Sequence, residues 1–361
     1  MFLKFINNSL FCLTCEYKFK LLIYTMQRHQ ATIKEIAQKL GVSISTVSRA
    51  LQNNTRIGLR TRERVWELAK SMHYVPNPAA IFLKKNRTYT IGVLLPYLQE
   101  EFFSMAISGI EDVALEKGYN VFVSQSRDKF EREEKALKSF LSSRVDGVIA
   151  SVAAETNNYS HFKEVENFGT PLVFFDRVPR NLEANKVRCS ISEGAFEAIE
   201  FLINKGVKRI ALINGPSNLE VSDERLNGYL NAIKKFNLET SPKYIKSTDL
   251  SKDDTIIKMK ELLALKEPPE AILTFNDYLA LYAMQFCKQK EIIPNKDILF
   301  VSFANLPMTL YLDNPPLASV EQFAYNLGIK ATELLINIIE NPSEEMPPYE
   351  EIVMGTKLII H

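Results

Sequence analysis

One short polar face, between Ser43 and Gln52, carries residue types that suit contact with a nucleic acid. Three apolar positions of this stretch share one side of a helix, namely Val47, Ala50 and Leu51. The opposite side contains no acidic residue and holds Ile44, Ser45, Ser48 and Arg49. Hydroxyl groups and a guanidinium can hydrogen-bond phosphates and base edges. The stretch therefore predicts a helix that reads duplex DNA.

Two further helices are needed to position this face. An apolar stripe with helical spacing precedes it, formed by Ile33, Ile36, Ala37 and Leu40. Gly41 ends that helix, and Ser43 can cap the next one by accepting a bond from an amide one turn on. A third helix, expected to open at Thr61, closes the core with Val65, Leu68, Ala69 and Met72. This arrangement is typical of a helix-turn-helix; the alternative is a generic three-helix unit.

The charge of the chain is divided unevenly along its length. The 361 residues have a net charge of +1. Residues 26–87 contain twelve basic and three acidic side chains, a balance of +9 that leaves −8 for the rest. Such asymmetry indicates a phosphate-binding module on a mildly acidic body, whereas the alternative is a solvated basic surface.

Residues 1–25 are apolar, but polar side chains interrupt them: Lys4, Asn7, Asn8, Glu16, Lys18 and Lys20. No run approaches the roughly 20 apolar residues of a membrane helix, and no cleavage site follows. We interpret this segment as a disordered leader or as sequence upstream of a start at Met26. Four cysteines make no disulfide framework, which favours a cytoplasmic compartment. Cys12 and Cys15 lack a second ligand pair, so we expect neither a metal nor a cofactor.

From Tyr89 onwards, strand-like and helix-like segments alternate. The expected strands are Tyr89–Leu95, Tyr119–Ser124, Gly147–Ser151, Leu172–Phe175, Arg209–Asn214, Ala271–Phe275 and Leu299–Phe303. The expected helices are Phe102–Lys117, Glu131–Ser142, Glu193–Asn204, Ser222–Phe236, Asp253–Leu265, Asp277–Lys290 and Tyr325–Glu340. This alternation predicts doubly wound parallel α/β sheets.

Two series of such segments indicate two lobes. We expect the chain to cross between them near Val187–Ser192, and again near Ala318–Gln322. The lobes would be 89–187 plus about 321–341, and 188–320 plus the C-terminal strands. Ligands of open α/β sheets bind beyond the carboxyl ends of the strands, so two facing lobes predict a cleft. We find no enzyme motif such as G-x-S-x-G or H-E-x-x-H, and the four histidines lack metal-ligand spacing.

Taken together, these segments resemble the lactose-repressor/galactose-repressor (LacI/GalR) family of bacterial transcription regulators. The resemblance runs from about Thr32 to the C-terminus and rests on TIKEIAQKLGVSISTVSRALQN, YVPNPAAIFL, YTIGVLLP, PLVFFDR, RLNGY, TFNDYLALYAM and SVEQ. It implies a small all-α helix-turn-helix head at 26–74 and a hinge helix and linker at 75–88. It also implies a two-lobed, periplasmic-binding-protein-like effector and dimerisation domain at 89–361.

The resemblance assigns roles in binding operator DNA as a homodimer. Ile44, Ser45 and Arg49 would face base edges. Phosphates would be held by Thr32, Ser43, Thr46, Ser48, Gln52, Arg56 and Thr61. Asn77 and Ala80 would belong to the hinge helix, with Leu83 as an apolar wedge in the minor groove. Ile81 stands where the family commonly has arginine.

The same resemblance implies a sugar or sugar derivative in the cleft. The candidate residues are Phe102, Phe103, Ser151, Asp176, Arg177, Arg225, Asn276 and Asp277. Aromatic rings match sugar ring faces, while carboxylate, amide and guanidinium groups match hydroxyls. The two phenylalanines could instead be core, and the Asp-Arg pair an interlobe salt bridge. Ala304 stands where many relatives carry an acid, and Asn305 could replace it.

The expected function is that of a repressor of carbohydrate-utilisation genes without enzymatic activity. Lobe closure around the effector would change the spacing of the two hinge segments and thereby the affinity for DNA. The alternatives are an extracytoplasmic sugar-binding protein, which predicts a cleavable signal and no basic head, an enzyme, and the same regulator acting as an activator or with a corepressor.

Overall fold

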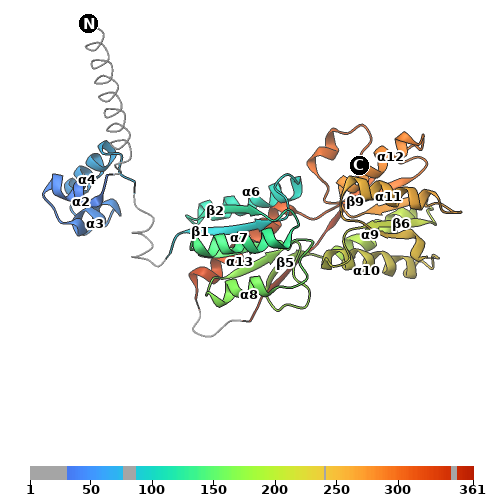
Figure 1. Cartoon of the computed structure of the whole chain (residues 1–361). Helices are drawn as coiled ribbons and strands as arrows, with labels where there is room; N and C mark the ends of the chain where they lie inside the picture. The colour runs from blue at the N-terminus through green and yellow to red at the C-terminus, as the bar shows by residue number, and fades with distance from the viewer. Residues whose placement is uncertain (1–30, 76–86, 240, 343–347) are drawn as a thin grey trace, which may run out of the picture. The chain divides into compact units, whose positions relative to one another are not determined.

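The computed structural model describes residues 31–75, 87–239, 241–342 and 348–361 (Figure 1). The chain divides into two compact units, Met1–Asn86 and Arg87–His361. The expected leader at 1–25 and the hinge residues Asn77, Ala80 and Leu83 lie outside the described residues. None of the helices within the described ranges has the length and apolar run that crossing a membrane requires.

Within residues 31–75, the first unit contains three helices, α2 (Ile33–Leu40), α3 (Ile44–Leu51) and α4 (Leu59–Ser71). A capping box opens α2, because Thr32 Oγ1 accepts from Glu35 N at 3.2 Å and Thr32 N donates to Glu35 Oε2 at 2.9 Å. Gly41 ends α2 in the left-handed conformation with φ 66°. Ser43 Oγ accepts from Thr46 N at 3.1 Å, which confirms the predicted cap of α3.

These three helices share one small core. Its buried side chains are Ile36, Ala37, Val47, Ala50, Val65 and Ala69. The other predicted apolar positions pack around them: Ile33, Leu40, Leu51, Leu68 and Met72. The three predicted stripes are therefore confirmed. The third helix begins at Leu59 with Gly58 as its N-cap, so Thr61 lies inside its first turn.

The second unit contains two six-stranded sheets. The first has the order β11-β5-β4-β3-β1-β2, with strands β1 (Thr90–Leu95), β2 (Asn120–Gln125), β3 (Gly147–Ala150), β4 (Leu172–Phe175), β5 (Asn185–Cys189) and β11 (Glu351–Met354). The second has the order β12-β10-β9-β8-β6-β7, with strands β6 (Ile210–Asn214), β7 (Ile245–Ser247), β8 (Ala271–Thr274), β9 (Leu299–Phe303), β10 (Ala318–Glu321) and β12 (Lys357–Ile360). All pairs are parallel except β10 with β12.

Helices cover both faces of each sheet (Figure 1). Around the first sheet lie α6 (Glu101–Glu116), α7 (Phe130–Ser142), α8 (Ser160–Asn167) and α13 (Ala324–Glu340). Around the second lie α9 (Ile191–Asn204), α10 (Glu220–Lys235), α11 (Lys252–Leu263) and α12 (Asp277–Gln289). Two short 3₁₀ helices span Pro242–Tyr244 and Pro307–Tyr311. Alternate residues of β1 enter different cores, with Val93 on one face and Leu94 on the other. The predicted doubly wound lobes are confirmed.

The chain passes between the lobes three times. The first two passages, from β5 into α9 and from β10 into α13, lie where the sequence predicts them. The third runs from β11 to β12 and was not predicted. Because β11 pairs with β5 from Glu351↔Lys186 to Met354↔Cys189, it belongs to the first lobe. Assigning both C-terminal strands to the second lobe was therefore wrong, and only β12 lies there.

Candidate ligand cleft and nucleic-acid interface

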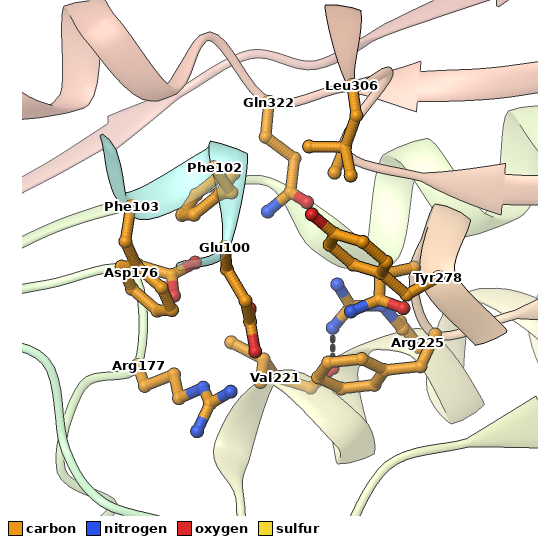
Figure 2. A pocket seen from close by; sticks show the side chains of 13 residues that line it. Glu100, Phe102, Phe103, Asp176, Arg177, Val221, Arg225, Tyr278, Leu306 and Gln322 are labelled. Atoms are coloured by element: carbon orange, nitrogen blue, oxygen red, sulfur yellow. Dashed lines mark hydrogen bonds between the residues drawn. The ribbon is translucent and has the colours of Figure 1, made fainter. Parts of the chain in front are cut away.

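A cavity lies between the lobes at the carboxyl ends of the parallel strands (Figure 2). Its volume is about 440 Å³ when the part open to solvent is counted. Only about 30 Å³ of this is wide enough to admit the centre of a water molecule. Both lobes contribute to its lining, which consists of Glu100, Phe102, Phe103, Asp176, Arg177, Val221, Arg225, Phe275, Asn276, Tyr278, Ala304, Leu306 and Gln322. The lobes are thus close together around a small polar and aromatic space.

Phe102 and Phe103 form an aromatic wall at the start of α6. Their rings meet edge to face with centroids 5.3 Å apart, and Phe103 meets Phe175 in the same way at 6.4 Å. Both side chains are almost fully buried, at 8% and 1% exposure, and both belong to the main hydrophobic core. The sequence left open whether these phenylalanines are core residues or ligand contacts. In the structure, each is a core residue that also lines the cavity.

Arg225 lies on α10, and its guanidinium group is held by two aromatic rings. Its guanidinium carbon lies 4.0 Å from the ring centroid of Phe275 and 4.3 Å from that of Phe303. Nη1 donates to Val221 O at 2.9 Å, whereas the buried Nε has no hydrogen-bond partner among the described residues (Figure 2). Burial lowers the pKa of Arg225 to about 10, and the Asp176 carboxylate opposes this shift. A cation with an unused donor therefore lines the cavity.

Asp176 and Arg177 follow β4 and enter the cavity from the first lobe. Burial raises the pKa of Asp176 to about 6, although Arg177 and Arg225 act to lower it. Arg177 Nη1 donates to Asp128 Oδ1 at 2.7 Å, within the same lobe. Burial opposes the charge of Arg177, but Asp128, Glu100 and Asp176 together raise its pKa. The ion pair of Arg177 is therefore not an interlobe salt bridge.

Three predicted effector residues do not reach this cavity. Asp277 is fully buried, and its carboxylate accepts from Ser302 Oγ, from Ser319 Oγ at 2.6 Å and from Leu306 N at 2.7 Å. Asn305 donates to Glu321 at 2.8 Å and its Oδ1 lies 3.0 Å from His361 Nε2. Ser151 is also fully buried, and its hydroxyl has no partner among the described residues. The structure therefore does not bring these three to the cavity, because two hold neighbouring loops and the third lies inside the first lobe.

Seven lining residues were missed, namely Glu100, Val221, Phe275, Tyr278, Ala304, Leu306 and Gln322. Most of them come directly before a helix or directly after a strand, as Glu100 does before α6 and Gln322 after β10. Position at a carboxyl strand end was the signal that could have found them. Burial raises the pKa of Glu100, with Arg177 acting in the opposite direction.

Hydrogen bonds that involve side chains also bridge the two lobes. Arg180 Nη2 of the first lobe donates to Ser217 O and Leu219 O, both at 3.2 Å, and lies 2.5 Å from an oxygen of Asp223. Asn218 of the second lobe donates to Ala154 O. Elsewhere, Met308 N donates to Glu101 Oε2 at 3.4 Å. These bonds form across the cleft and hold the lobes in the closed arrangement.

In the first unit, α3 presents the predicted recognition surface to solvent. Ile44 is 49% exposed, although it is a large apolar residue. The remaining predicted contacts are exposed or partly exposed: Thr32, Ser43, Ser45, Thr46, Ser48, Arg49, Gln52, Arg56 and Thr61. Behind them, Trp66 Nε1 donates to Asn53 Oδ1 and Arg62 Nη1 to Asn53 O, each at 3.3 Å. These two side chains, which the sequence did not single out, fix the turn after α3.

Comparison with known families decides the identity of this architecture. Residues 32–77 match the profile of the bacterial regulatory proteins of the lacI family. Residues 88–355 match the profile of periplasmic binding proteins and the sugar binding domain of the LacI family. The chain belongs to the LacI family. It is a DNA-binding transcriptional regulator with a small-molecule effector, as the sequence resemblance implied.

Individual relatives are similar over three quarters or more of the chain. The HTH-type transcriptional repressor CytR of Escherichia coli (strain K12) is 31% identical over 311 residues, which are 86% of this chain and 90% of CytR. A periplasmic binding protein/LacI transcriptional regulator from Alkaliphilus metalliredigens QYMF, solved in complex with D-xylulofuranose, is 26% identical with a TM-score of 0.64, covering 75% of this chain and 97% of that chain. The lac repressor dimer bound to operator and the anti-inducer ONPF has the same fold, with 24% identity, a TM-score of 0.80 and coverage of 92% and 98%.

Proposed function

We propose that this regulator is a cytoplasmic repressor of carbohydrate-utilisation genes that binds operator DNA as a homodimer. Its operator affinity is set by a sugar-like effector in the cavity between the lobes. One observation carries the proposal: a single chain joins a helix-turn-helix with an uncovered recognition face to a cleft lined by aromatic rings, carboxylates and guanidinium groups. CytR, a repressor by name, supports the sign of regulation.

The lining of the cavity favours a sugar or sugar derivative. Arg225 can donate to ring or hydroxyl oxygens, and the ionised Asp176 can accept from neighbouring hydroxyls. Phe102 and Phe103 supply an apolar wall for a ring face. We propose Asn276, Arg177, Glu100 and Gln322 as the remaining polar contacts. Ala304 leaves the cavity without a carboxylate at that position, so the ligand is held from the Asp176 side. The xylulofuranose bound by the Alkaliphilus relative belongs to this chemical class.

The head at 26–74 is proposed to read the operator through α3. Ile44, Ser45 and Arg49 contact base edges, while phosphates are held by Thr32, Ser43, Thr46, Ser48, Gln52, Arg56 and Thr61. The segment 75–88 then acts as hinge and linker, with Asn77, Ala80 and Leu83 at the minor groove. The unit at 89–361 binds effector and pairs with its copy. The helix-turn-helix favours this role over that of an extracytoplasmic binding protein.

We propose binding without turnover for the cleft. The named relatives are transcriptional regulators, and both arginines of the cavity make fixed contacts, Arg177 with Asp128 at 2.7 Å and Arg225 Nη1 with Val221 O at 2.9 Å. Such groups orient a ligand and close the lobes around it.

A combined ligand and DNA experiment tests the proposal. Full-length protein is screened against sugars, sugar phosphates and nucleosides by thermal shift, because a ligand of the native state raises the melting temperature. Duplexes are enriched from a random pool by the same protein. We expect a sugar-containing compound to raise the melting temperature and to change affinity for the enriched near-palindromic duplex. Failure to enrich any duplex at low salt would contradict the DNA role, and a ligand of another class would contradict the effector assignment.

A further inference from the structure

The first residues of the effector unit are held in place by a cluster of hydrogen bonds around Asp146. Thr88 N donates to Asp146 Oδ1 at 2.8 Å, and Tyr89 N donates to Oδ2 at 2.7 Å. The Thr88 hydroxyl lies 3.0 Å from Asp146 Oδ1 and 2.9 Å from Arg144 O. Arg87 Nη2 donates to Ile339 O at 2.7 Å. Three consecutive residues, which the segment 76–86 joins to the DNA-binding head, are thus fixed to the first lobe.

We call the hydrogen bonds that hold Arg87, Thr88 and Tyr89 to the first lobe the clamp. The clamp also imposes an unusual backbone conformation. Tyr89 has φ 51°, in the left-handed region that a bulky residue rarely adopts. Its N–H is taken by Asp146, its carbonyl accepts from Asn120 N at 2.8 Å, and its ring lies 5.5 Å from that of Tyr119. These contacts determine the conformation from both sides of the residue. The direction in which the chain leaves β1 towards the head is therefore set by the clamp.

The two anchors of the clamp lie on elements that run to the cleft. Asp146 directly precedes β3, and beyond the other end of β3 the loop reaches Ala154, whose carbonyl accepts from Asn218 of the second lobe. Ile339 lies in the last turn of α13, and the segment before its first turn contains Gln322, which lines the cavity. A helix of this length spans about 25 Å, at roughly 1.5 Å per residue. Strand β3 and helix α13 thus connect the region of the cavity to residues 87–89, where the linker ends.

We propose that Asp146, with Thr88 and Arg87, is the positioning device that transmits the arrangement of the lobes to the DNA-binding head. The inference rests on the proposed function, because it requires that the cleft controls operator binding. When an effector changes how the second lobe meets Ala154 and Gln322, β3 and α13 move with the first lobe. The clamped residues then move as part of that lobe and do not absorb the motion by local rotation.

The second lobe contains a matched control. Glu270 directly precedes β8 as Asp146 precedes β3, and its Oε2 accepts from Lys208 N at 2.8 Å and from Arg209 N at 3.0 Å at the start of β6. Neither of these two residues has a positive φ. Their chain leads back to α9 of the same lobe, not to the head. The Glu270 cluster therefore shares with the clamp a carboxylate that accepts from two consecutive N–H groups, and it adds an ion pair with Arg209 at 2.8 Å. It lacks the positive φ and the connection to the head.

The experiment compares Asp146→Asn, Thr88→Val and Glu270→Gln in the full-length protein. The measurements are amide hydrogen exchange, affinity for the duplex enriched by wild-type protein, and melting temperature. Asp146→Asn is expected to speed exchange at Thr88 and Tyr89 and to weaken duplex binding by at least about fivefold, the lower end of typical coupling between sites. Thr88→Val, which keeps the carboxylate, should cause a smaller change in the same direction. Glu270→Gln should speed exchange at Lys208 and Arg209 while duplex affinity stays within about twofold of wild type.

Two results would overturn the proposal that Asp146 transmits the arrangement of the lobes to the head. One is equal weakening of duplex binding by Asp146→Asn and Glu270→Gln at equal loss of melting temperature, which would make both residues structural only. The other is faster exchange at Thr88 and Tyr89 in both first-lobe variants with unchanged duplex affinity. Failure of the proposed function looks different, because wild-type protein would then enrich no duplex at all.

Discussion

Arg225 illustrates how a single side chain can be both part of the core and part of a binding site. Phe275 and Phe303 hold its guanidinium at 4.0 and 4.3 Å, so it loses little conformational freedom when a ligand binds. Its buried Nε lacks a partner among the described residues, and an unsatisfied buried donor is costly. A ligand oxygen that accepts from this group would remove that cost. The protein is thus poised to favour an oxygen-rich ligand.

Replacing Arg225 tests this directly. Arg225→Lys retains the charge but loses the planar donor fork and the stacking between the rings. We expect effector affinity to fall at least about tenfold, equivalent to roughly 1.4 kcal/mol, while duplex binding without effector is retained. Isothermal titration with the compound found by thermal shift provides the measurement. Arg132→Lys, at an exposed arginine of the first lobe, serves as the control, and equal effects of the two changes would refute the assignment.

The carboxyl of Asp176 predicts a pH dependence of effector binding. Burial raises its pKa to about 6, so it is ionised at pH 7 and becomes protonated as the pH falls through 6. If the ionised form accepts from ligand hydroxyls, affinity should decrease about tenfold per pH unit below that value. Titrations between pH 5 and about 8 measure this, and Asp176→Asn should bind weakly at every pH. A flat profile in the wild-type protein would exclude an ionised Asp176 from the contact.

At the level of single residues, the sequence predicted the cavity only where position and chemistry coincide. Asp176 follows a strand, the two phenylalanines lie in the first turn of α6, and Arg225 lies near the start of α10. All four also suit a sugar, so both arguments select them. Asp277 has the right chemistry at the right end of a strand, yet it binds Ser302 and Ser319. Those partners lie far away in the sequence, on β9 and β10, and both donate to Oδ1, while Leu306 N donates to Oδ2. No local pattern reveals that both carboxylate oxygens are used.

Among the secondary-structure elements, helix α3 is the one whose proposed role in DNA recognition can be tested by substitution. Arg49 is exposed on the face that carries Ile44 and Ser45, whereas Arg56 lies in the turn before α4. Arg49→Ala should relax the base preference at one position of each half-site, at a cost of about 1–3 kcal/mol on the best duplex. Arg56→Ala should weaken all duplexes alike. Binding to the enriched duplex and to random duplex is compared, and equal losses for Arg49→Ala on both would refute its role.

Hydrophobic periodicity was enough to predict the helices and strands that bury one regular apolar face, but it did not predict the others. The head helices and the long helix α13 were predicted within two residues, because each presents one apolar stripe to a core. The edge strand β7 was not recognised, and the edge strand β11 was expected in the wrong lobe, since both are short and half exposed. Strand β5, with the sequence NKVRC, alternates buried and partly exposed residues, and its position at the crossing hid it. Pairing of β11 with β5 is a long-range contact that no local signal specifies.

For the whole molecule, we propose that closure of the two lobes connects ligand binding to DNA binding. Arg180 bonds Ser217 and Leu219 across the cleft and pairs with Asp223, so Arg180→Ala should favour the open arrangement. We expect effector affinity to fall about threefold to tenfold, because binding must then also drive closure, while the melting temperature without ligand changes little. Lys129→Ala, which breaks an exposed pair with Glu155 inside the first lobe, is the control. An unchanged effector affinity in Arg180→Ala would show that this bridge does not contribute to closure.

The central claim is that one chain couples a sugar-type ligand in its cleft to the grip of its head on duplex DNA. The most direct measurement is the affinity of full-length protein for its enriched duplex, with and without the compound found by thermal shift, over a range of salt concentrations. We predict that the compound changes the affinity at least about fivefold, and that log affinity falls linearly with log salt with a slope of about 0.9 per phosphate contact. Duplex binding that is insensitive to both the compound and salt would contradict the account.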